Sequence, residues 1–408
     1  MLNFKKIIKG IDVAFFLALK NIFFKKKMLF MIIIIIGLGY LSTTFSSSII
    51  QGLKYTIEDK AISVMTGNVL IEPKSDEDYI KNTNEIIKKA LSIPGVVAVS
   101  PHFNRGITLI DEYGTKVAAQ LKIIEPEKEA LATSIDENII SGKYLSQQAT
   151  GEILLGSDLT KKYRMQEALP AIDVDAGEKI TVVFDNGLTK KMKVRGIYSL
   201  KFAATDIYVY ATKEEAKQIF NLTDDKLNYA SEILIKTNKR GFEEKVVYML
   251  KSFNINGRIW PWQEKLGVLN QFTDSLLIVS KITGLIGIII AFATIYIMIY
   301  INVRQKRSQI GIMKAIGINK ETILSSYIIQ SFFYGLLGGL FGFFLTKSVI
   351  GYYTVNPIPM PMGDVVPIIS STTYIYSFII LMFSSLVAGY FASQGVIKEN
   401  ILDAIFRG

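Results

Sequence analysis

Long apolar runs without a charge alternate with mixed segments along the chain, and their lengths predict the fold class. The first run, MLFMIIIIIGLGYL from Met28, leads into a stretch rich in Ser and Thr, whose hydroxyls can bond to their own helix. A helix over residues 28–50 is ~35 Å long and can cross a hydrocarbon layer of ~30 Å. Three further apolar runs of spanning length follow. The pattern predicts transmembrane helices over 28–50, 271–303 (with a stalk at its start), 323–350 and 374–395.

The segment between the first two runs, 51–270, mixes polar and apolar residues. VVAVSPHF, RGITLID, KITVVF and MKVRGIY predict separate strands, and Asn186-Gly187 predicts a tight hairpin turn between the last two. Runs over 79–91, 157–164 and 213–220 predict helices, the first of them beginning at Tyr79 after the acidic residues Asp76, Glu77 and Asp78. About 220 residues can bury a core of their own. We therefore predict an α-helical membrane domain with four transmembrane helices plus a large α+β extracytoplasmic domain between helices 1 and 2.

The net charge of +10 becomes informative once it is located along the chain. Residues 51–274 hold 30 Lys and Arg and 31 Asp and Glu, which leaves 46 − 30 = 16 basic and 36 − 31 = 5 acidic residues for the rest. The basic excess therefore flanks the membrane segments. Such a distribution is typical of topology charges and argues against a nucleic-acid partner.

The positive-inside rule converts this distribution into a topology. Seven lysines precede the first span, the loop 304–322 is basic, and the loop 351–373 has Asp364 but no Lys or Arg. We predict that 1–27 (an interfacial helix), 304–322 and the tail 396–408 are cytoplasmic, and that 51–270 and 351–373 lie outside. A secretory signal is the alternative interpretation of the basic start, but the first run is long and lacks a small-residue cleavage pattern.

The chain offers little material for catalysis or metal binding. It has no cysteine and one histidine, His102, which has no evident partner along the sequence and is predicted to be a packed or surface side chain. No phosphate-binding loop with G-x-x-x-x-G-K-[ST] spacing occurs. We therefore expect no catalytic, cofactor or metal site on this chain.

Two features of the membrane segments predict helix packing and lipid contact. Gly335/Gly339 and Gly338/Gly342 form small-xxx-small pairs that let helix backbones approach closely in lipid. We expect the side-chain amide of Gln330, near the cytoplasmic end of the third span, to form a hydrogen bond to another helix. Lys281 and Lys347 fall near the outer interface, where snorkelling of their side chains accounts for them.

The loop 304–322 is the most informative stretch. It holds the string IGIMKAIG, with four apolar side chains and two glycines between basic residues. A short apolar helix of this kind can dock into a groove on a cytosolic partner, or it can form a turn that follows the membrane surface. Physical chemistry alone leaves both interpretations open.

The string KRSQIGIMKAIGINKETIL resembles the coupling segment of the FtsX-like ABC permeases, a superfamily that includes the lipoprotein-releasing (LolC/LolE) and MacB types. Gln309 stands where that family commonly has Glu. The resemblance implies that the loop docks on a cytosolic ABC ATPase dimer, which would bind ATP and Mg²⁺. The coupling residues it implies are Arg307, Gln309, Ile310, Gly311, Ile312, Met313, Lys314, Ala315, Ile316 and Gly317.

The resemblance extends over nearly the whole chain. GEILLGSDLTKKY, GEKITVVF and DIYVYATKEEAKQIFNL resemble landmarks of a MacB-type periplasmic core domain, and QGVIKENILDAIFRG resembles the closing stretch. It implies a multi-pass protein of the cell inner membrane that pairs with a second permease copy or a homologous permease. It also implies mechanotransmission, in which ATP-driven motion reaches the outer domain through the second span. The substrate implied is a lipoprotein of the outer leaflet, passed to a periplasmic acceptor.

Three alternatives stay open at this point. The chain resembles MacB-like exporters of other substrates, and FtsX-like signalling permeases that activate a cell-wall hydrolase, although the outer domain of the latter is smaller. A membrane-anchored enzyme is the third class. In LolC-type members the hairpin that corresponds to 185–187 is extended and binds the lipoprotein chaperone, so a tight turn here predicts a LolE-like role, a different acceptor or another substrate.

Overall fold

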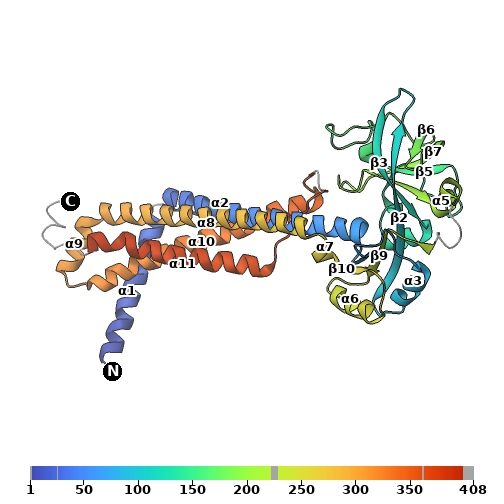
Figure 1. Cartoon of the computed structure of the whole chain (residues 1–408). Helices are drawn as coiled ribbons and strands as arrows, with labels where there is room; N and C mark the ends of the chain where they lie inside the picture. Colours follow the sequence, from blue (N-terminus) through green and yellow to red (C-terminus); the bar gives the residue numbers. More distant parts are fainter. Residues whose placement is uncertain (1, 25, 222–227, 361–362, 398–408) are drawn as a thin grey trace. The chain divides into compact units, whose positions relative to one another are not determined.

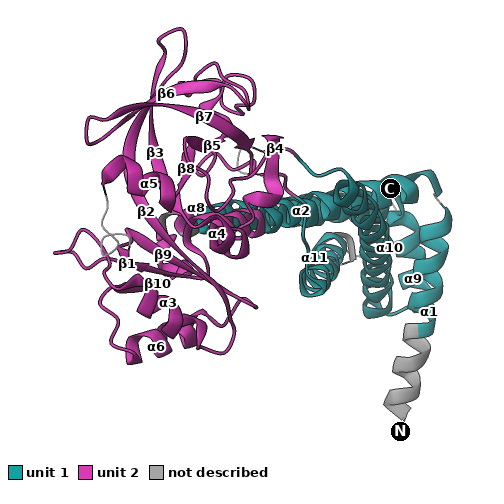
Figure 2. Cartoon of the chain, turned by 90° about the vertical axis from the view of Figure 1, so that its right-hand side faces the viewer, with its two compact units in different colours: residues 1–53, 273–358, 366–408 teal, residues 54–272, 359–365 magenta. Residues whose placement is uncertain are grey.

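The computed structural model describes residues 2–24, 26–221, 228–360 and 363–397. The chain divides into two compact units, which Figure 2 colours separately. The membrane unit comprises residues 1–53, 273–358 and 366–408, and the α+β unit comprises residues 54–272 and 359–365. Two long helices, α2 and α8, each contain a boundary between the units.

All regular elements that the structure describes in the membrane unit are helices. In the described part of the chain, four helices are long and apolar enough to cross a membrane: Lys26–Thr66, Gln271–Gln305, Lys320–Val355 and Ser371–Gln394. The predicted fold class is thereby confirmed. The helical elements of this unit are α1 (Leu2–Phe24), α2 (Lys26–Lys60), α8 (Gly267–Gln305), α9 (Arg307–Ala315), α10 (Lys320–Val355) and α11 (Ser371–Ile397) (Figure 1).

Glycines bring helix α10 close to two neighbours. A Cβ placed on Gly335 or Gly339 would lie within 3.0 Å of side-chain atoms of α11, from Ser385 and from Phe378 respectively. A Cβ on Gly338 or Gly342 would clash in the same way with α2. The two small-residue pairs therefore face two different helices of the same chain, which is the close packing that such pairs permit in lipid.

Among the described residues, the buried side chain of Gln330 makes no hydrogen bond to another helix, so the predicted interhelical bond is wrong. Its Nε2 donates to the hydroxyl of Tyr334 at 2.6 Å, one turn further along α10. Its Oε1 has no hydrogen-bond partner among the described residues. The i, i+4 spacing offered a nearer partner than a second helix did.

The α+β unit is built on one long strand. Strand β2 pairs with β9 along its first half, from Val96 to His102, and with β3 along its second half, from Phe103 to Ile110. Each half belongs to a separate lobe. The strands are β1 (Val69–Glu72), β2 (Val96–Ile110), β3 (Lys116–Ile124), β4 (Ile139–Gly142), β5 (Glu152–Gly156), β6 (Lys179–Phe184), β7 (Thr189–Tyr198), β8 (Tyr208–Thr212), β9 (Glu232–Thr237) and β10 (Arg258–Pro261).

The first lobe is a sheet in the order β10-β1-β9-β2, and helices α3 (Thr83–Leu91) and α6 (Glu243–Ser252) pack on it. The second lobe continues from β2 through β3, β8, β5 and β7. Strand β6 pairs with both β7 and β2, so this lobe closes into a barrel. Apolar side chains fill the barrel, as closure of a small barrel requires. Helix α5 (Lys213–Phe220) packs on β8 and β3 of the barrel, and helix α4 (Pro126–Ala132) packs on β2 and β9.

Several predicted elements of this unit are wrong in detail. Helix α3 begins at Thr83 and not at Tyr79, because Ile80 pairs with Ala230 and Asn82 takes a left-handed conformation (φ 56°). The predicted helix over 157–164 is a single 3₁₀ turn, Ser157–Leu159. VVAVSPHF and RGITLID form the one strand β2. The β6–β7 hairpin is tight as predicted, but only Gly187 has positive φ (84°).

The segment ahead of the second span is not one continuous helix. Trp260 and Pro261 belong to strand β10, a short helix α7 (Trp262–Lys265) follows, and Leu266 interrupts the helix before α8 begins at Gly267. From Gly267 to Gln305, however, α8 is continuous. Helix α2 runs ten residues past the predicted end of the first span, at 50, to Lys60, where a π-helical segment (Ala61–Thr66) begins.

Part of the loop 351–373 belongs to the α+β unit. Residues 359–365 group with it, and the carboxylate of Asp364 pairs with Lys201 at 2.6 Å. The loop and the domain 54–272 must therefore lie on the same side of the membrane, which is the side that the charge distribution places outside.

Cysteine labelling tests this topology directly, because the chain has no native cysteine. Tyr113 is 79% exposed at the β2–β3 hairpin, and Ser308 is exposed on α9. We expect a membrane-impermeant maleimide to label Tyr113→Cys in intact spheroplasts and to label Ser308→Cys only after permeabilisation. The reverse result would place the α+β unit in the cytoplasm.

Candidate coupling site

The C-terminal end of helix α9 is capped by a glycine. Gly317 has φ 91°, its N–H donates to the carbonyl of Lys314 at 3.1 Å, and the N–H of Ile318 donates to the carbonyl of Met313 at 3.0 Å. This pair of bonds is a Schellman motif, in which a glycine takes the left-handed position at no steric cost. The side chains of Ile318 and Met313 pack against the same apolar core, as often accompanies the motif.

The helix is amphipathic, and its two faces separate the predicted coupling residues. Ile310 and Gly311 are buried, and Met313 is half-buried against the core of the membrane unit. Ile312 and Ile316, one turn apart, are 53% and 72% exposed. Of the remaining predicted residues, Gln309, Ala315 and Gly317 are exposed, whereas Arg307 and Lys314 are half-buried.

The buried face of α9 is fixed to the membrane unit. Ile310 is fully buried, and the preceding Lys306 donates from its ammonium to the amide oxygen of Asn21 on α1. Lys306 is also 6.0 Å from the centre of the Phe24 ring. A displacement of α9 must therefore move the helices behind it, since packed interiors transmit strain.

We name Gln309, Ile312, Ala315 and Ile316 the α9 face. Two exposed isoleucines on a short, capped helix make a surface that would be stabilised by an apolar groove on a partner. The four residues fall at i, i+3, i+6 and i+7, so all lie on one side of the helix. Gly311, predicted to contact the partner, is buried and does not belong to this face.

Sequence reasoning missed a second element, a joint of buried side chains within the α+β unit. The buried carboxylate of Glu243 accepts hydrogen bonds from Asn68 Nδ2 at 3.0 Å, from the Trp262 indole at 3.3 Å and from the N–H of Gly241. Trp262 also packs with Ile62 of the π-helical segment. The joint thus ties the segment that follows α2 to the segment that precedes α8. A Trp-Glu-Asn set dispersed over the sequence gives no pattern that would reveal it.

No metal site is evident in the described residues, where no cluster of three or more His, Asp or Glu side chains has a suitable arrangement. His102 is fully buried between two glutamates, with Nε2 2.6 Å from Glu129 Oε2 and Nδ1 3.2 Å from Glu232 Oε1. Lys122 completes this cluster through Glu232 at 2.9 Å. The arrangement is a neutralised ionic core, and its His102 is packed as the sequence predicted.

A substitution on the α9 face tests whether this surface binds the expected ATPase subunit. Ile316→Asp places a charge on a surface that would be desolvated by a partner, so we expect about thirtyfold weaker binding of the ATPase subunit, equivalent to ~2 kcal/mol. The chain itself should remain folded, since Ile316 is mostly exposed. Co-purification and binding of the ATPase measure the effect.

The matched control is Thr354→Asp, the same charge on an exposed residue near the other end of α10. It should bind the ATPase as the wild type does. Normal ATPase binding by both Ile312→Asp and Ile316→Asp would remove the docking function from this face.

Comparison with known proteins gives two family matches. Residues 28–244, more than half of the chain, match the MacB-like periplasmic core domain, and residues 281–401 match the C-terminal domain of FtsX-like permeases. The second match includes α9 and the whole of α10. The expected resemblance is confirmed.

Individual relatives are distant but similar in length. The chain is 21% identical to the lipoprotein-releasing system transmembrane protein LolC of Buchnera aphidicola, over 80% of this chain and 79% of that protein. It is also 21% identical to the putative hemin transport system permease protein HrtB of Staphylococcus haemolyticus, over 73% and 76%. Among solved structures, the periplasmic region of MacB from Actinobacillus actinomycetemcomitans aligns at 13% identity and a TM-score of 0.36, over 52% of this chain and 97% of that one.

Proposed function

Since the chain belongs to the family of ABC permeases that have a MacB-like periplasmic core domain and an FtsX-like C-terminal domain, we propose that it converts ATP hydrolysis by a cytosolic partner into work on the outer side of the membrane. Family membership implies an ATPase partner and pairing of permeases. Relatives of this family are transmembrane subunits and not ATPases.

One observation carries the proposal. Helix α8 is continuous over Gly267–Gln305, and α9 with its exposed isoleucines begins two residues after α8 ends. A partner that moves the α9 face would therefore act next to the end of the continuous helix α8. A continuous helix can transmit a tilt or an axial shift, whereas a flexible linker cannot.

We further propose that the substrate is lipid-anchored and is taken from the outer leaflet of the cell inner membrane to a periplasmic acceptor. The similarity to LolC over most of both chains supports this choice. The chain would hold no cofactor of its own, and ATP and Mg²⁺ would bind the partner ATPase. Because the β6–β7 hairpin is tight, the acceptor would bind to a different surface of the chain.

Release of hemin or another small amphiphile is the second candidate, because the HrtB relative is named for hemin transport. A comparison of cargo decides between the two. We would purify the complex with an ATPase variant that binds but does not hydrolyse ATP, and identify what co-purifies by mass spectrometry. Acylated N-terminal peptides support the lipoprotein proposal, whereas hemin without such peptides supports the alternative.

A further inference from the structure

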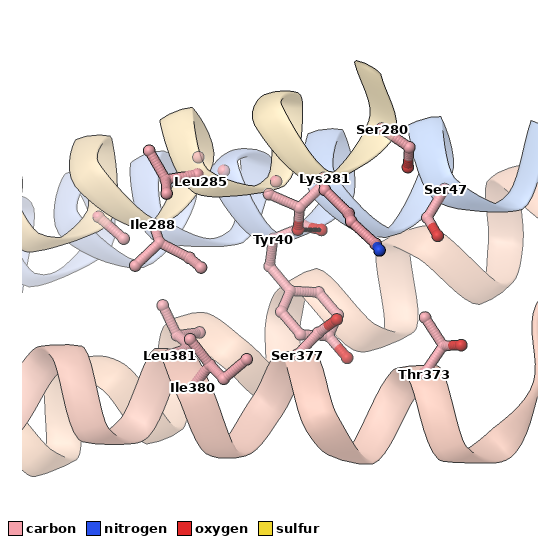
Figure 3. Close-up of a pocket in the computed structure, with 15 residues that line it drawn as sticks. Tyr40, Ser47, Ser280, Lys281, Leu285, Ile288, Thr373, Ser377, Ile380 and Leu381 are labelled. Atoms are coloured by element: carbon pink, nitrogen blue, oxygen red, sulfur yellow. Dashed lines mark hydrogen bonds between the residues drawn. The ribbon is translucent and has the colours of Figure 1, made fainter. Parts of the chain in front are cut away.

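A cavity of about 380 Å³ lies within the membrane unit, between α2, α8 and α11. Its size falls within the range of ~300–1,000 Å³ that small-molecule sites occupy. Figure 3 shows side chains from all three helices converging on it. All of its lining residues belong to this one unit.

The lining changes character along the cavity. Hydroxyls and one ammonium gather at one end, from Ser47 on α2, Ser280 and Lys281 on α8, and Ser377 on α11 (Figure 3). Leu285, Ile288 and Leu381 line the other end. The polar end lies toward the start of α11 and of the α8 span, which the topology places outside. A cavity that is polar at the outer interface and apolar below it suits an amphiphile whose head group is at the membrane surface.

The polar end of the cavity has the groups needed to bind a negatively charged ligand. Lys281 has no hydrogen bond or ion pair with any residue that the structure describes, and no Asp or Glu lines the cavity. Ser280 and Ser377 likewise make no hydrogen bond within the described chain, so both hydroxyls can donate to a ligand. Lys281 lies ~12 Å from the middle of the apolar segment 276–302 at 1.5 Å per residue, so its long side chain reaches the head-group level.

Lys281 differs in this respect from the other lysine of the outer leaflet. Lys347 on α10 is exposed and lines no part of the cavity. Snorkelling alone would account for both lysines, but it does not account for the uncharged, hydroxyl-lined recess beside Lys281. The two residues therefore form a natural comparison.

Small residues create the space. A Cβ on Gly284 would have no atom within 4 Å, although this glycine lines the cavity. In contrast, a Cβ on Gly287 would lie 2.2 Å from Thr43 Cγ2, so α2 and α8 touch there. The helices thus contact at Gly287 and leave an open recess at Gly284, one turn nearer the outer surface.

We propose that this cavity binds the phosphate and the upper part of one acyl chain of an anionic phospholipid of the outer leaflet, while the rest of the lipid lies in the bilayer. The phosphate would accept hydrogen bonds from the Lys281 ammonium and from the Ser280 and Ser377 hydroxyls, and an acyl chain would lie along Leu285, Ile288 and Leu381. The lipid would fill the space between α8 and α11 and would steady α8 in its span. This proposal does not depend on the identity of the transported substrate.

Native mass spectrometry of the purified permease–ATPase complex tests the proposal. The complex is exchanged into detergent with equal amounts of phosphatidylglycerol and phosphatidylcholine, and bound lipid is counted. We expect one phosphatidylglycerol per permease chain in preference to phosphatidylcholine. Lys281→Gln should lower the phosphatidylglycerol occupancy about fivefold, as loss of one lysine near a lipid surface predicts, and Lys347→Gln should leave it unchanged.

Gly284→Phe is the second variant, since the open space accepts its ring without disturbing the fold. It should exclude the lipid while ATPase binding persists. Equal losses from Lys281→Gln and Lys347→Gln, or wild-type occupancy in Gly284→Phe, would overturn the proposal. So would a native complex whose cavity ligand is the acyl anchor of a protein, or a wild-type complex that retains no phosphatidylglycerol.

Discussion

Four glycines inserted after Gln271 should lower ATP-driven release of a lipid-anchored substrate about tenfold or more, with ATP hydrolysis retained. The insertion lies in α8, ahead of the apolar segment and after the joint formed by Glu243 and Trp262. Four glycines cost ~4 kcal/mol in helix propensity relative to four alanines, enough to break the helix. Helix α2 would remain, but a single connection can act as a pivot and does not impose a tilt.

Four alanines at the same point are the matched control, because they lengthen α8 by about one turn and keep it helical. We expect this variant to retain more release activity than the glycine variant. ATPase rate and substrate release, measured on the same proteoliposomes, separate coupling from folding. Wild-type release by the glycine variant would show that α8 does not drive the α+β unit.

Glu129→Gln should destabilise the α+β unit by about 3–5 kcal/mol. The Glu129 carboxylate is fully buried and accepts from Ser100 Oγ and His102 Nε2, both at 2.6 Å. Its neutralisation leaves the cluster with Lys122 and protonated His102 against Glu232 alone. Breaking a buried charge pair costs this much because the remaining charge stays out of water.

Intrinsic fluorescence reports the effect in the full chain, since both tryptophans, Trp260 and Trp262, belong to the α+β unit. Glu85→Gln, which removes half of an exposed i, i+4 pair with Lys89, is the control and should leave the unfolding transition in place. An unchanged transition in Glu129→Gln would mean that the cluster does not stabilise the unit.

The same cluster predicts a pH dependence. Burial lowers the pKa of His102, but the charge of Glu129 and the hydrogen bonds that the imidazolium donates to both glutamates outweigh it, so the pKa lies above its ordinary value of 6.5. Burial raises the pKa of Glu129, but the charge and hydrogen bond of His102 outweigh it, so the pKa lies below 4.5. The contribution of His102 to the free energy of unfolding is fully present below pH 6.5, and it is lost as the pH rises through the pKa of His102 in the folded state. The contribution of Glu129 is fully present above pH 4.5, and it is lost as the pH falls through the pKa of Glu129 in the folded state. Fluorescence-detected unfolding should therefore show greatest stability from this cluster between about pH 4.5 and 6.5.

The membrane architecture followed from the sequence because length and the absence of charge are sufficient to identify a span. The exposed and buried sides of helix α9 could also have been separated from the sequence. Ile310 and Met313 are three residues apart, and Ile312 and Ile316 are four apart, so helical periodicity assigns the two pairs to different sides. Which pair faces the core depends on α1 and α10, and that required the structure.

Elements of the α+β unit that were predicted wrongly are held by contacts distant in sequence. Tyr79 stacks on Phe103 at 5.1 Å between ring centres, which keeps it out of the helix it precedes. The 157–164 segment bends because the Asp158 N–H bonds to the carbonyl of Asp206 at 3.0 Å. His102 lies 27 and 130 residues from its two glutamate partners. Local propensity and periodicity carry no information about such pairs.

Release of a lipid-anchored protein by the purified complex tests the central claim most directly. The complex is reconstituted in proteoliposomes with an acylated protein, ATP is added on the side of the ATPase, and the protein that enters the soluble phase with an acceptor present is measured. The account predicts release that requires ATP hydrolysis, that fails with a non-hydrolysable analogue and that is lost in Ile316→Asp. Steady ATP hydrolysis by the wild-type complex with no acylated protein released would contradict it.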